Sequence, residues 1–162
     1  NNGIVLLNRV FQLMREGRMR RAQSSCEASG HPWHQPNDLP RWQGDVDAVA
    51  EILANLIENA LRYAPPQAPI GFCWSTSAEA VQLLLWDGGR PIPEPERERI
   101  FCQGQRGTTG AGHQGTGYGL SLGRQLALSL GGALTLITQP RLLCSEATPE
   151  GNGFLLTLPT SP

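Results

Sequence analysis

Residues 45 to 66 constrain the fold more strongly than any other stretch of the chain. Asp45 is a favourable helix N-cap, and the apolar residues after it recur at the spacing of one helix face. These residues are Val46, Val49, Ile52, Leu53, Leu56, Ile57, Ala60 and Leu61. The run ends at Ala64-Pro65-Pro66, where proline cannot continue a helix. The sequence therefore predicts a long amphipathic helix that stops at these prolines.

Two runs with the composition of strands follow this helix. They are IGFCWSTS (70–77) and AVQLLLWD (80–87), and the short turn between them predicts an antiparallel pair. Near the C-terminus, ALTLIT (133–138) and FLLTLP (154–159) also have the pattern of strands. A polar excursion that includes ATPEGNG (147–153) separates this second pair.

The remaining segments give weaker signals. A short amphipathic helix is expected from Ile4 to Met14, and HPWHQPNDLP (31–40) is interpreted as an edge strand and a connecting loop. Short helices are also expected from Glu96 to Ile100 and from Leu120 to Leu130. The Gly-rich stretch between them has little apolar content. Loops this long in compact domains are usually functional lids or disordered segments.

Composition excludes several classes of function. The chain has 162 residues and a formal net charge of −1, with acidic and basic residues mixed, so one domain and no nucleic-acid partner are expected. Its basic residues are all Arg, because the sequence contains no Lys. A Walker-type phosphate loop, a eukaryotic-type protein kinase and Schiff-base catalysis each need a lysine. These three chemistries are therefore excluded.

The cysteines and the hydropathy pattern bear on the compartment. Cys26, Cys73, Cys102 and Cys144 are far apart and form no C-x-x-C pair, so they are interpreted as reduced thiols. The apolar stretches are shorter than the roughly 20 residues of a membrane span, and no signal peptide opens the chain. A cytoplasmic domain without direct membrane contact is expected. Because the first residue is Asn rather than Met, we expect a fragment of a larger protein, which leaves open a membrane anchor elsewhere.

A polar stripe runs along the predicted long helix. Asn55, Asn59 and Arg62 lie at positions i, i+4 and i+7, beside the apolar face. A solvated face is the simple interpretation, but asparagine is a poor helix former, so two on one stripe favour a functional reason. An amide oxygen is a hard ligand suited to magnesium, and an arginine one turn further on can meet a phosphate.

Two further features have both a structural and a functional interpretation. Asp87 ends an apolar strand before Gly88 and Gly89, where it can form a turn or accept a hydrogen bond from an exocyclic amine such as that of adenine. In HQGTGYGLSL (113–122), alternating glycines precede a helix. They form either an ordinary loop or a phosphate cradle, because glycine allows close approach and helix N-termini present unpaired N–H groups.

Four motifs in order resemble a known family. ILANLIENALRYAPP, WDGGRPIP, RERIF and QGTGYGLSL resemble the N, G1, F and G2 boxes of the gyrase, heat-shock chaperone, histidine kinase and mismatch-repair ATPase superfamily. The chain looks most like the ATP-binding catalytic domain of bacterial sensor histidine kinases. The resemblance covers about residues 45–159. It implies an α+β fold, a two-layer α/β sandwich with helices on one face of a mixed, mostly antiparallel sheet, which agrees with the order of predicted elements.

The resemblance assigns roles to residues of the predicted long helix. It implies that Asn59 ligates Mg²⁺, that Arg62 contacts phosphate and that Tyr63 packs near the adenine of ATP. Asn55 matches a position that is Glu in the hydrolysing relatives, where it acts as base for water. Its absence favours transfer to a protein histidine over hydrolysis.

The other boxes receive roles in the same way. The resemblance implies that Asp87 accepts the adenine amine, that Gly89 lets the base approach and that Ile92 contacts the nucleotide. Phe101 matches the anchor of the lid over ATP, and Arg106 the arginine that reaches the terminal phosphate. The G2 box supplies further nucleotide contacts, namely Gly115, Gly117, Gly119 and Leu120.

The implied activity is transfer of the terminal phosphate of Mg-ATP to a histidine, in two-component signal transduction. The phosphoacceptor motif of the family is missing, and His31, His34 and His113 lie in loop-like contexts. We therefore expect residues 1–162 to form a single catalytic domain, with the dimerisation/phosphoacceptor and sensor domains outside this chain. The implied partners are that phosphoacceptor domain of the same protein and a response regulator.

Two alternatives stay open, and a departure from the family bears on one of them. The G1 box commonly reads D-x-G-x-G, and Pro91 replaces its second glycine here, which predicts a stiffer hinge because proline fixes φ and lacks an N–H. This departure keeps open a degenerate module that binds nucleotide or nothing and works only as a protein-interaction platform. The other is an anti-sigma-type serine kinase of the same superfamily, whose general base Asn55 does not supply, although Glu58 lies nearby.

Overall fold

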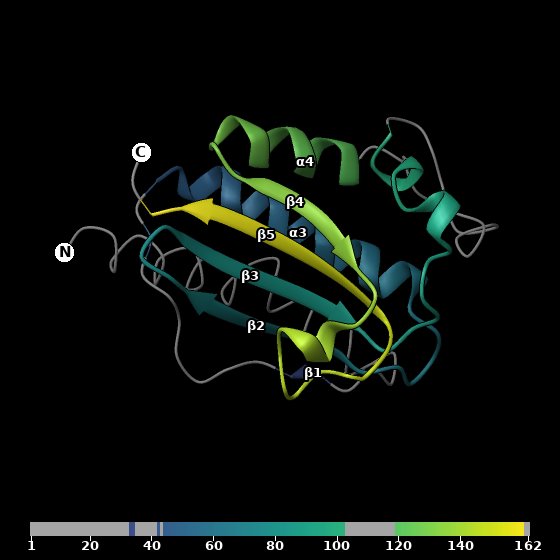
Figure 1. Cartoon of the computed structure of the whole chain (residues 1–162). Helices are drawn as coiled ribbons and strands as arrows, with labels where there is room; N and C mark the ends of the chain where they lie inside the picture. Colours follow the sequence, from purple (N-terminus) through teal and green to yellow (C-terminus); the bar gives the residue numbers. More distant parts are fainter. Residues whose placement is uncertain (1–32, 35–41, 43, 103–118, 161–162) are drawn as a thin grey trace.

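The computed structural model describes residues 33–34, 42, 44–102 and 119–160, and all structural statements below concern these residues (Figure 1). The predicted helix from Ile4 to Met14 and most of the predicted lid lie outside this part of the chain. The described residues form a sheet with two helices packed on one of its faces.

Five described strands form a mixed sheet in the order β1-β2-β3-β5-β4. They are β1 (Trp33–His34), β2 (Ile70–Thr76), β3 (Ala80–Asp87), β4 (Ala133–Ile137) and β5 (Asn152–Pro159). Strand β1 pairs in parallel with β2, and all other pairs are antiparallel. The predicted edge strand and the predicted mostly antiparallel sheet are therefore confirmed.

The predicted long helix is α3 (Val46–Tyr63). Its first turn is capped as expected, because the Asp45 carboxylate accepts a hydrogen bond of 3.1 Å from the Ala48 N–H. Its last turn closes with a bond from the Ala64 N–H to the Ala60 carbonyl, just before the two prolines. The second helix, α4 (Gly119–Ser129), begins and ends one residue earlier than predicted.

The main core lies between these helices and the sheet. Residues of β3 and β5 that alternate along each strand point toward α3, and cross-strand partners such as Leu85 and Phe154 are both buried there. From α3 the core receives Val49, Ile52, Leu53, Leu56, Ile57 and Ala60. The two-layer arrangement with helices on one face is the α+β fold that the sequence predicted.

The opposite face of the sheet carries a smaller cluster around Trp86. Glycines 71 and 153 are its partners on the two neighbouring strands, and a Cβ on Gly71 would lie 2.3 Å from the indole. Gly71 therefore leaves room for this ring, on which His34 stacks with centroids 5.6 Å apart, whereas a Cβ on Gly153 would lie 2.9 Å from side-chain atoms of Leu84 and Ile137. The segment between β4 and β5, including the 3₁₀ turn η4 (Pro140–Leu142), adds buried Cys144 and Ala147. This excursion is thus less polar than predicted.

Several predicted boundaries differ from the structure. The short helix expected from Glu96 to Ile100 was wrong, since the chain forms two 3₁₀ turns, η1 (Glu94–Glu96) and η2 (Arg99–Phe101). Pro93 and Pro95 lie at the start of η1, where proline is tolerated, so they do not account for the break between the two turns. Strand β5 begins at Asn152, two residues before the predicted start.

Three of the four cysteines lie among the described residues. Cys73, Cys102 and Cys144 are free thiols, whereas Cys26 lies outside the described residues. Burial, followed by the neighbouring Cys144 thiol, raises the pKa of the Cys73 thiol well above its ordinary value, which makes it a poor nucleophile. No described helix is both long and apolar enough to cross a membrane.

Candidate functional site

Described residues of all four predicted boxes gather at one end of the sheet. Strand β3 ends there in Asp87, α3 reaches its C-terminus there, and α4 begins there at Gly119 (Figure 1, right). The turns η1 and η2 lie between the end of β3 and the start of the undescribed segment 103–118. The fold therefore brings together motifs that are far apart in the sequence.

Asp87 and Gly89 form a tight buried turn. Asp87 is 6% exposed, and its Oδ1 accepts a hydrogen bond of 2.8 Å from the Gly89 N–H. A Cβ on Gly89 would lie 2.6 Å from that oxygen and 3.0 Å from Cδ of Pro65, so only glycine fits without a shift. The turn-forming interpretation of Asp87 is thus confirmed. It leaves the adenine interpretation possible, because a carboxylate accepts several hydrogen bonds at once.

The backbone around Pro91 is held by a residue that the sequence analysis did not single out. Asn152 is 7% exposed and faces Asp87 across the β3–β5 pair. Its Oδ1 accepts from the Ile92 N–H and its Nδ2 donates to the Arg90 carbonyl, each at 2.8 Å. The Arg97 Nε also donates to the Ile92 carbonyl at 3.2 Å. Hydrogen bonds therefore hold the backbone on both sides of Pro91, and the predicted stiffness of this hinge stays a prediction.

The polar stripe of α3 lies beside the start of α4. Asn55, Asn59, Arg62 and Tyr63 are all half-buried. A Cβ on Gly119 would lie 3.6 Å from Asn55 Oδ1, so the N box and the G2 box are neighbours. The Asn55 Nδ2 is buried and has no hydrogen-bond partner among the described residues. A buried polar group without a partner is costly, which favours a ligand or water at this place.

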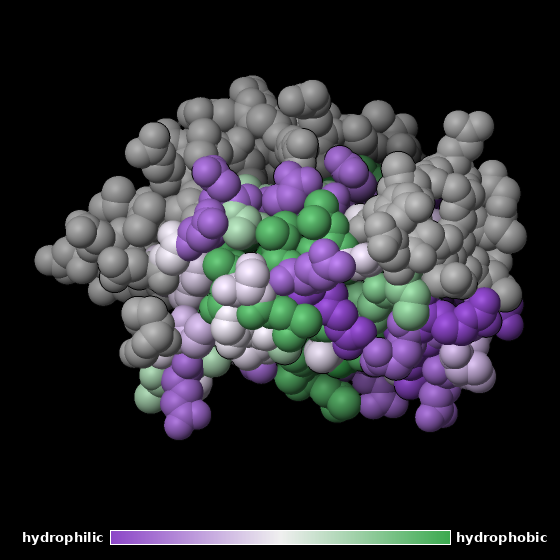
Figure 2. Space-filling view, turned by 90° about the horizontal axis from the view of Figure 1, so that it is seen from above, coloured by the Kyte–Doolittle hydropathy of each residue, from purple (hydrophilic) through white to green (hydrophobic). Residues whose placement is uncertain are grey.

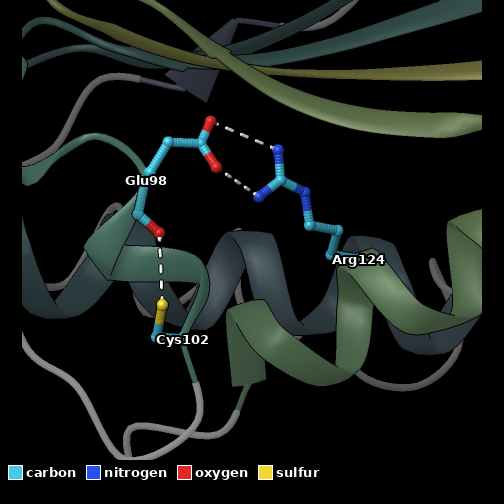
Figure 3. Close-up of polar contacts among 3 residues, drawn as sticks. All are labelled: Glu98, Cys102 and Arg124. Atoms are coloured by element: carbon cyan, nitrogen blue, oxygen red, sulfur yellow. Dashed lines mark hydrogen bonds and ion pairs between the residues drawn. The ribbon is translucent and has the colours of Figure 1, made fainter.

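The base of the predicted lid is held by contacts across α4 and β5. Phe101 is buried and packs edge-to-face on Phe154, with ring centroids 6.1 Å apart. The Arg124 guanidinium lies 4.1 Å above the Phe101 ring. It also pairs with Glu98, with 2.9 Å between Nη1 and Oε2 (Figure 3). The hydrogen bond and the charge of Arg124 lower the pKa of Glu98.

Arg124 and Glu98 were not identified from the sequence, because nothing local marks two residues 26 positions apart as a pair. Cys102 adds a smaller contact, since its thiol donates to the Glu98 carbonyl at 3.7 Å (Figure 3). These contacts connect the residues just before the undescribed segment with the helix just after it. They define the lid base as Glu98, Phe101 and Arg124.

The remaining predicted site residues divide into two groups. Ile92 and Leu120 are partly buried and pack against the main core, next to the turn and the helix start respectively. Arg106, Gly115 and Gly117 lie outside the described residues, as does His113. The roles predicted for all of these residues stay predictions.

The surface above α4 carries exposed apolar side chains. The view onto this helix shows apolar surface in the middle of the face, with polar residues around it (Figure 2). On α4, Leu122 is 41% exposed and Leu128 is 62% exposed. Asp87 of the candidate site lies instead at the end of the sheet, where β3 finishes.

The donor groups at this end suit a magnesium nucleotide better than a metal bound by protein alone. No group of three or more His, Cys, Asp or Glu side chains gathers among the described residues. Magnesium keeps several waters and commonly binds through one or two protein oxygens plus phosphates, which matches a single amide such as Asn59. The Asn55 Nδ2, which has no hydrogen-bond partner among the described residues, fits a polar ligand at this place.

Comparisons with known proteins agree on the type of domain. The family described as "Histidine kinase-, DNA gyrase B-, and HSP90-like ATPase" matches residues 44–162. Sensor histidine kinase Hik2 of Thermosynechococcus vestitus is 31% identical over 141 residues, 85% of this chain and 35% of that protein. Sensor protein KdpD of Escherichia coli is 34% identical over 124 residues, 76% of this chain and 13% of that protein.

Solved structures share the fold. The mycobacterial sensor histidine kinase MprB superposes with a TM-score of 0.75 at 24% identity, covering 94% of this chain and 97% of that one. The catalytic domain of histidine kinase ThkA gives a TM-score of 0.73 at 23% identity, covering 93% and 94%. The chain spans about a third of Hik2 and 28% of the adaptive-response sensory kinase SasA of Synechococcus.

Proposed function

Because the chain belongs to the family of histidine kinase-, DNA gyrase B- and HSP90-like ATPases, we propose that it binds Mg-ATP and donates the terminal phosphate to a histidine on a separate dimerisation/phosphoacceptor domain. That domain would belong to the same protein and would pass the phosphate to a response regulator. Residues 1–162 would then act as one catalytic domain, active only with its phosphoacceptor.

One observation carries this proposal, namely that residues from three of the boxes meet at one end of the sheet. Asp87 and Gly89 form a buried turn there, and Asn55 lies against Gly119 at the start of α4. Such a site offers a carboxylate for an exocyclic amine and helix-terminal N–H groups for phosphate. Relatives named as sensor histidine kinases support the transfer, and a full-length ShkA structure with the same fold (TM-score 0.64) contains AMPPNP.

The chain's own residues would bind and orient the nucleotide. Asp87 would accept the adenine amine while Gly89 and Ile92 line the base, and Tyr63 would pack nearby. Asn59 would hold Mg²⁺, which when bound supplies positive charge to the phosphate oxygens. Arg62, Arg106 and the N–H groups around Gly115, Gly117, Gly119 and Leu120 would offset the charge that develops on the transferred group.

Asn55, one turn before Asn59, favours transfer of the terminal phosphate over hydrolysis of ATP. Asn55 carries no carboxylate that can act as a base for water, and its amide is half-buried against Gly119. An imidazole nitrogen from the other domain would form the new bond to phosphorus while the bond to the bridging oxygen breaks and ADP leaves. Positioning and charge stabilisation then account for the catalysis.

The test uses labelled ATP with two acceptors, a histidine-bearing dimerisation segment and a serine-bearing anti-anti-sigma protein. We expect label on the histidine and none on the serine. Asn59→Asp should abolish magnesium-dependent transfer while the domain stays folded. Glu58→Gln is the matched control, because Glu58 is an exposed neighbour on the same helix. Label on serine that the Glu58 variant removes would establish the serine kinase instead.

A further inference from the structure

The turn at residues 88–92 contains two backbone groups that lie beyond the last pair of the sheet ladder and need other hydrogen-bond partners. Pro91 has no N–H, and the flanking groups, the Arg90 carbonyl and the Ile92 N–H, lie just beyond the last β3–β5 pair, that of Asp87 with Asn152. Backbone groups left without partners in such a place cost free energy. The side chain of Asn152 satisfies both, one through its oxygen and one through its nitrogen.

From this geometry we propose that Asn152 is a positioning residue for the nucleotide, which holds the turn carrying Gly89 and Ile92 in its binding shape. The inference rests on the proposed function, since it concerns how the base is recognised. A planar amide is suited to this place, because it presents an acceptor and a donor side by side. An aspartate would keep the acceptor but lose the donor.

Burial makes the arrangement rigid. Asn152 is 7% exposed, Gly89 is buried, and the Ile92 side chain packs against the main core. Arg97 fixes the remaining polar group of Ile92, its carbonyl. Every backbone hydrogen-bonding group of Ile92 therefore has a described partner. The turn enters the binding site with its shape already set, which lowers the ordering cost of binding.

The fixed turn also bears on selectivity between bases. A carboxylate favours a donor such as the adenine amine over the guanine carbonyl only if its position is fixed, because buried polar groups left unpaired oppose the wrong ligand. Asp87 leads directly into the turn, and its Oδ1 accepts from Gly89 within it. Loosening the turn is therefore expected to weaken adenine nucleotides more than guanine nucleotides.

The experiment titrates ADP and GDP, each with Mg²⁺, into the 162-residue chain and into Asn152→Ala. We expect the Kd for ADP to rise about tenfold and the preference for adenine to fall, since removing the side chain takes away the partner of both the Ile92 N–H and the Arg90 carbonyl. Thr160→Ala is the matched control. It removes a 2.8 Å bond from a side chain to the Ala78 carbonyl just beyond the far end of β5. We expect this control to bind ADP like the wild type.

Hydrogen exchange at the Ile92 N–H gives a readout that needs no nucleotide. This amide should exchange faster in Asn152→Ala than in the wild type, while the amides within β3 stay protected. If the alanine variant does not fold, Asn152→Asp, which keeps the acceptor for the Ile92 N–H but loses the donor to the Arg90 carbonyl, should weaken ADP binding while exchange at Ile92 stays closer to the wild-type rate.

The outcomes separate this inference from the proposed function. A wild-type chain that binds neither nucleotide counts against the proposed function. Hydrogen exchange at the Ile92 N–H still tests whether Asn152 holds the turn. Wild-type binding together with unchanged ADP affinity in a folded Asn152 variant would overturn the inference. Equal losses in the Asn152 and Thr160 variants would also overturn it, because they would reflect general destabilisation.

Discussion

The two edges of the candidate site are held in different ways. At the G1 edge, Asp87 and Asn152 are almost fully buried, and their side chains fix the turn around Pro91. At the lid base, one buried ring, Phe101, carries an ion pair whose members are 29% and 82% exposed. Buried, fully paired polar groups rigidify a site, whereas exposed ion pairs contribute little. The comparison indicates a tightly held G1 edge and a more loosely held lid base.

The largest expected effect tests whether the stability of the lid base depends on the Phe101 ring. Phe101→Ala should lower the free energy of unfolding by about 3 kcal/mol, because it removes a buried aromatic side chain from contact with Phe154. Urea denaturation measures this loss. Leu128→Ala on α4 is the control, since its side chain is 62% exposed and should change stability by at most about 0.5 kcal/mol. Similar values for the two variants would show that the ring does not anchor the lid base.

A smaller effect tests the difference in the space around Gly89, at the G1 edge, and around Gly119, at the start of α4. At Gly89 an added Cβ would meet Asp87 Oδ1 at 2.6 Å, whereas at Gly119 its nearest neighbour, Asn55 Oδ1, is 3.6 Å away. Overpacking costs about 1–3 kcal/mol, so Gly89→Ala should weaken Mg-ADP binding about tenfold or more. Gly119→Ala should change it by less than about threefold. Calorimetric titration compares them, and equal losses would remove the distinction.

The smallest effect concerns Arg124. Arg124→Gln should lower the free energy of unfolding by about 0.5–1 kcal/mol, chiefly through the lost cation–π contact with Phe101. Glu98→Gln should cost less, because Glu98 is largely exposed and its charge is screened. A double-mutant cycle isolates the coupling between the two residues. A coupling as large as the effect of Phe101→Ala would contradict the idea of a loosely held lid base.

The same pair predicts a weak dependence of stability on pH. The pKa of Glu98 is lowered in the folded protein, so its contribution is present above the unfolded pKa and is lost as pH falls through the folded one. The stability difference between the wild type and Glu98→Gln should therefore shrink in acid. In the Arg124→Gln background this change should vanish, and its persistence there would assign the effect to another group.

Local patterns were sufficient to predict most of the framework. The period of apolar residues predicted α3, the apolar run in AVQLLLWD predicted β3, and Pro65 marked where the helix stops. These signals depend on neighbours in sequence, so they can be identified without a structure. The resemblance of the four boxes to the family implied one shared site, and the described residues of these boxes lie at one end of the sheet, whereas Arg106, Gly115 and Gly117 lie outside the described residues.

What the sequence did not reveal depends on register and packing. Asn152 lies 60 and 62 positions from the two groups it binds, and only the pairing of β3 with β5 places it there. The contact of Arg124 with Phe101 likewise needs α4 to lie over the turn η2. The failed helix prediction at residues 96–100 concerns two short 3₁₀ turns, which local composition does not distinguish from one short helix.

The most direct test of the central claim is a calorimetric titration of the chain with ATP in the presence and absence of Mg²⁺. The proposal predicts saturable binding of one nucleotide per chain that depends on Mg²⁺ and is strongly weakened by Asp87→Asn. A folded wild-type chain that gives no binding heat over a range of temperatures, or that binds equally well after Asp87→Asn, would contradict it.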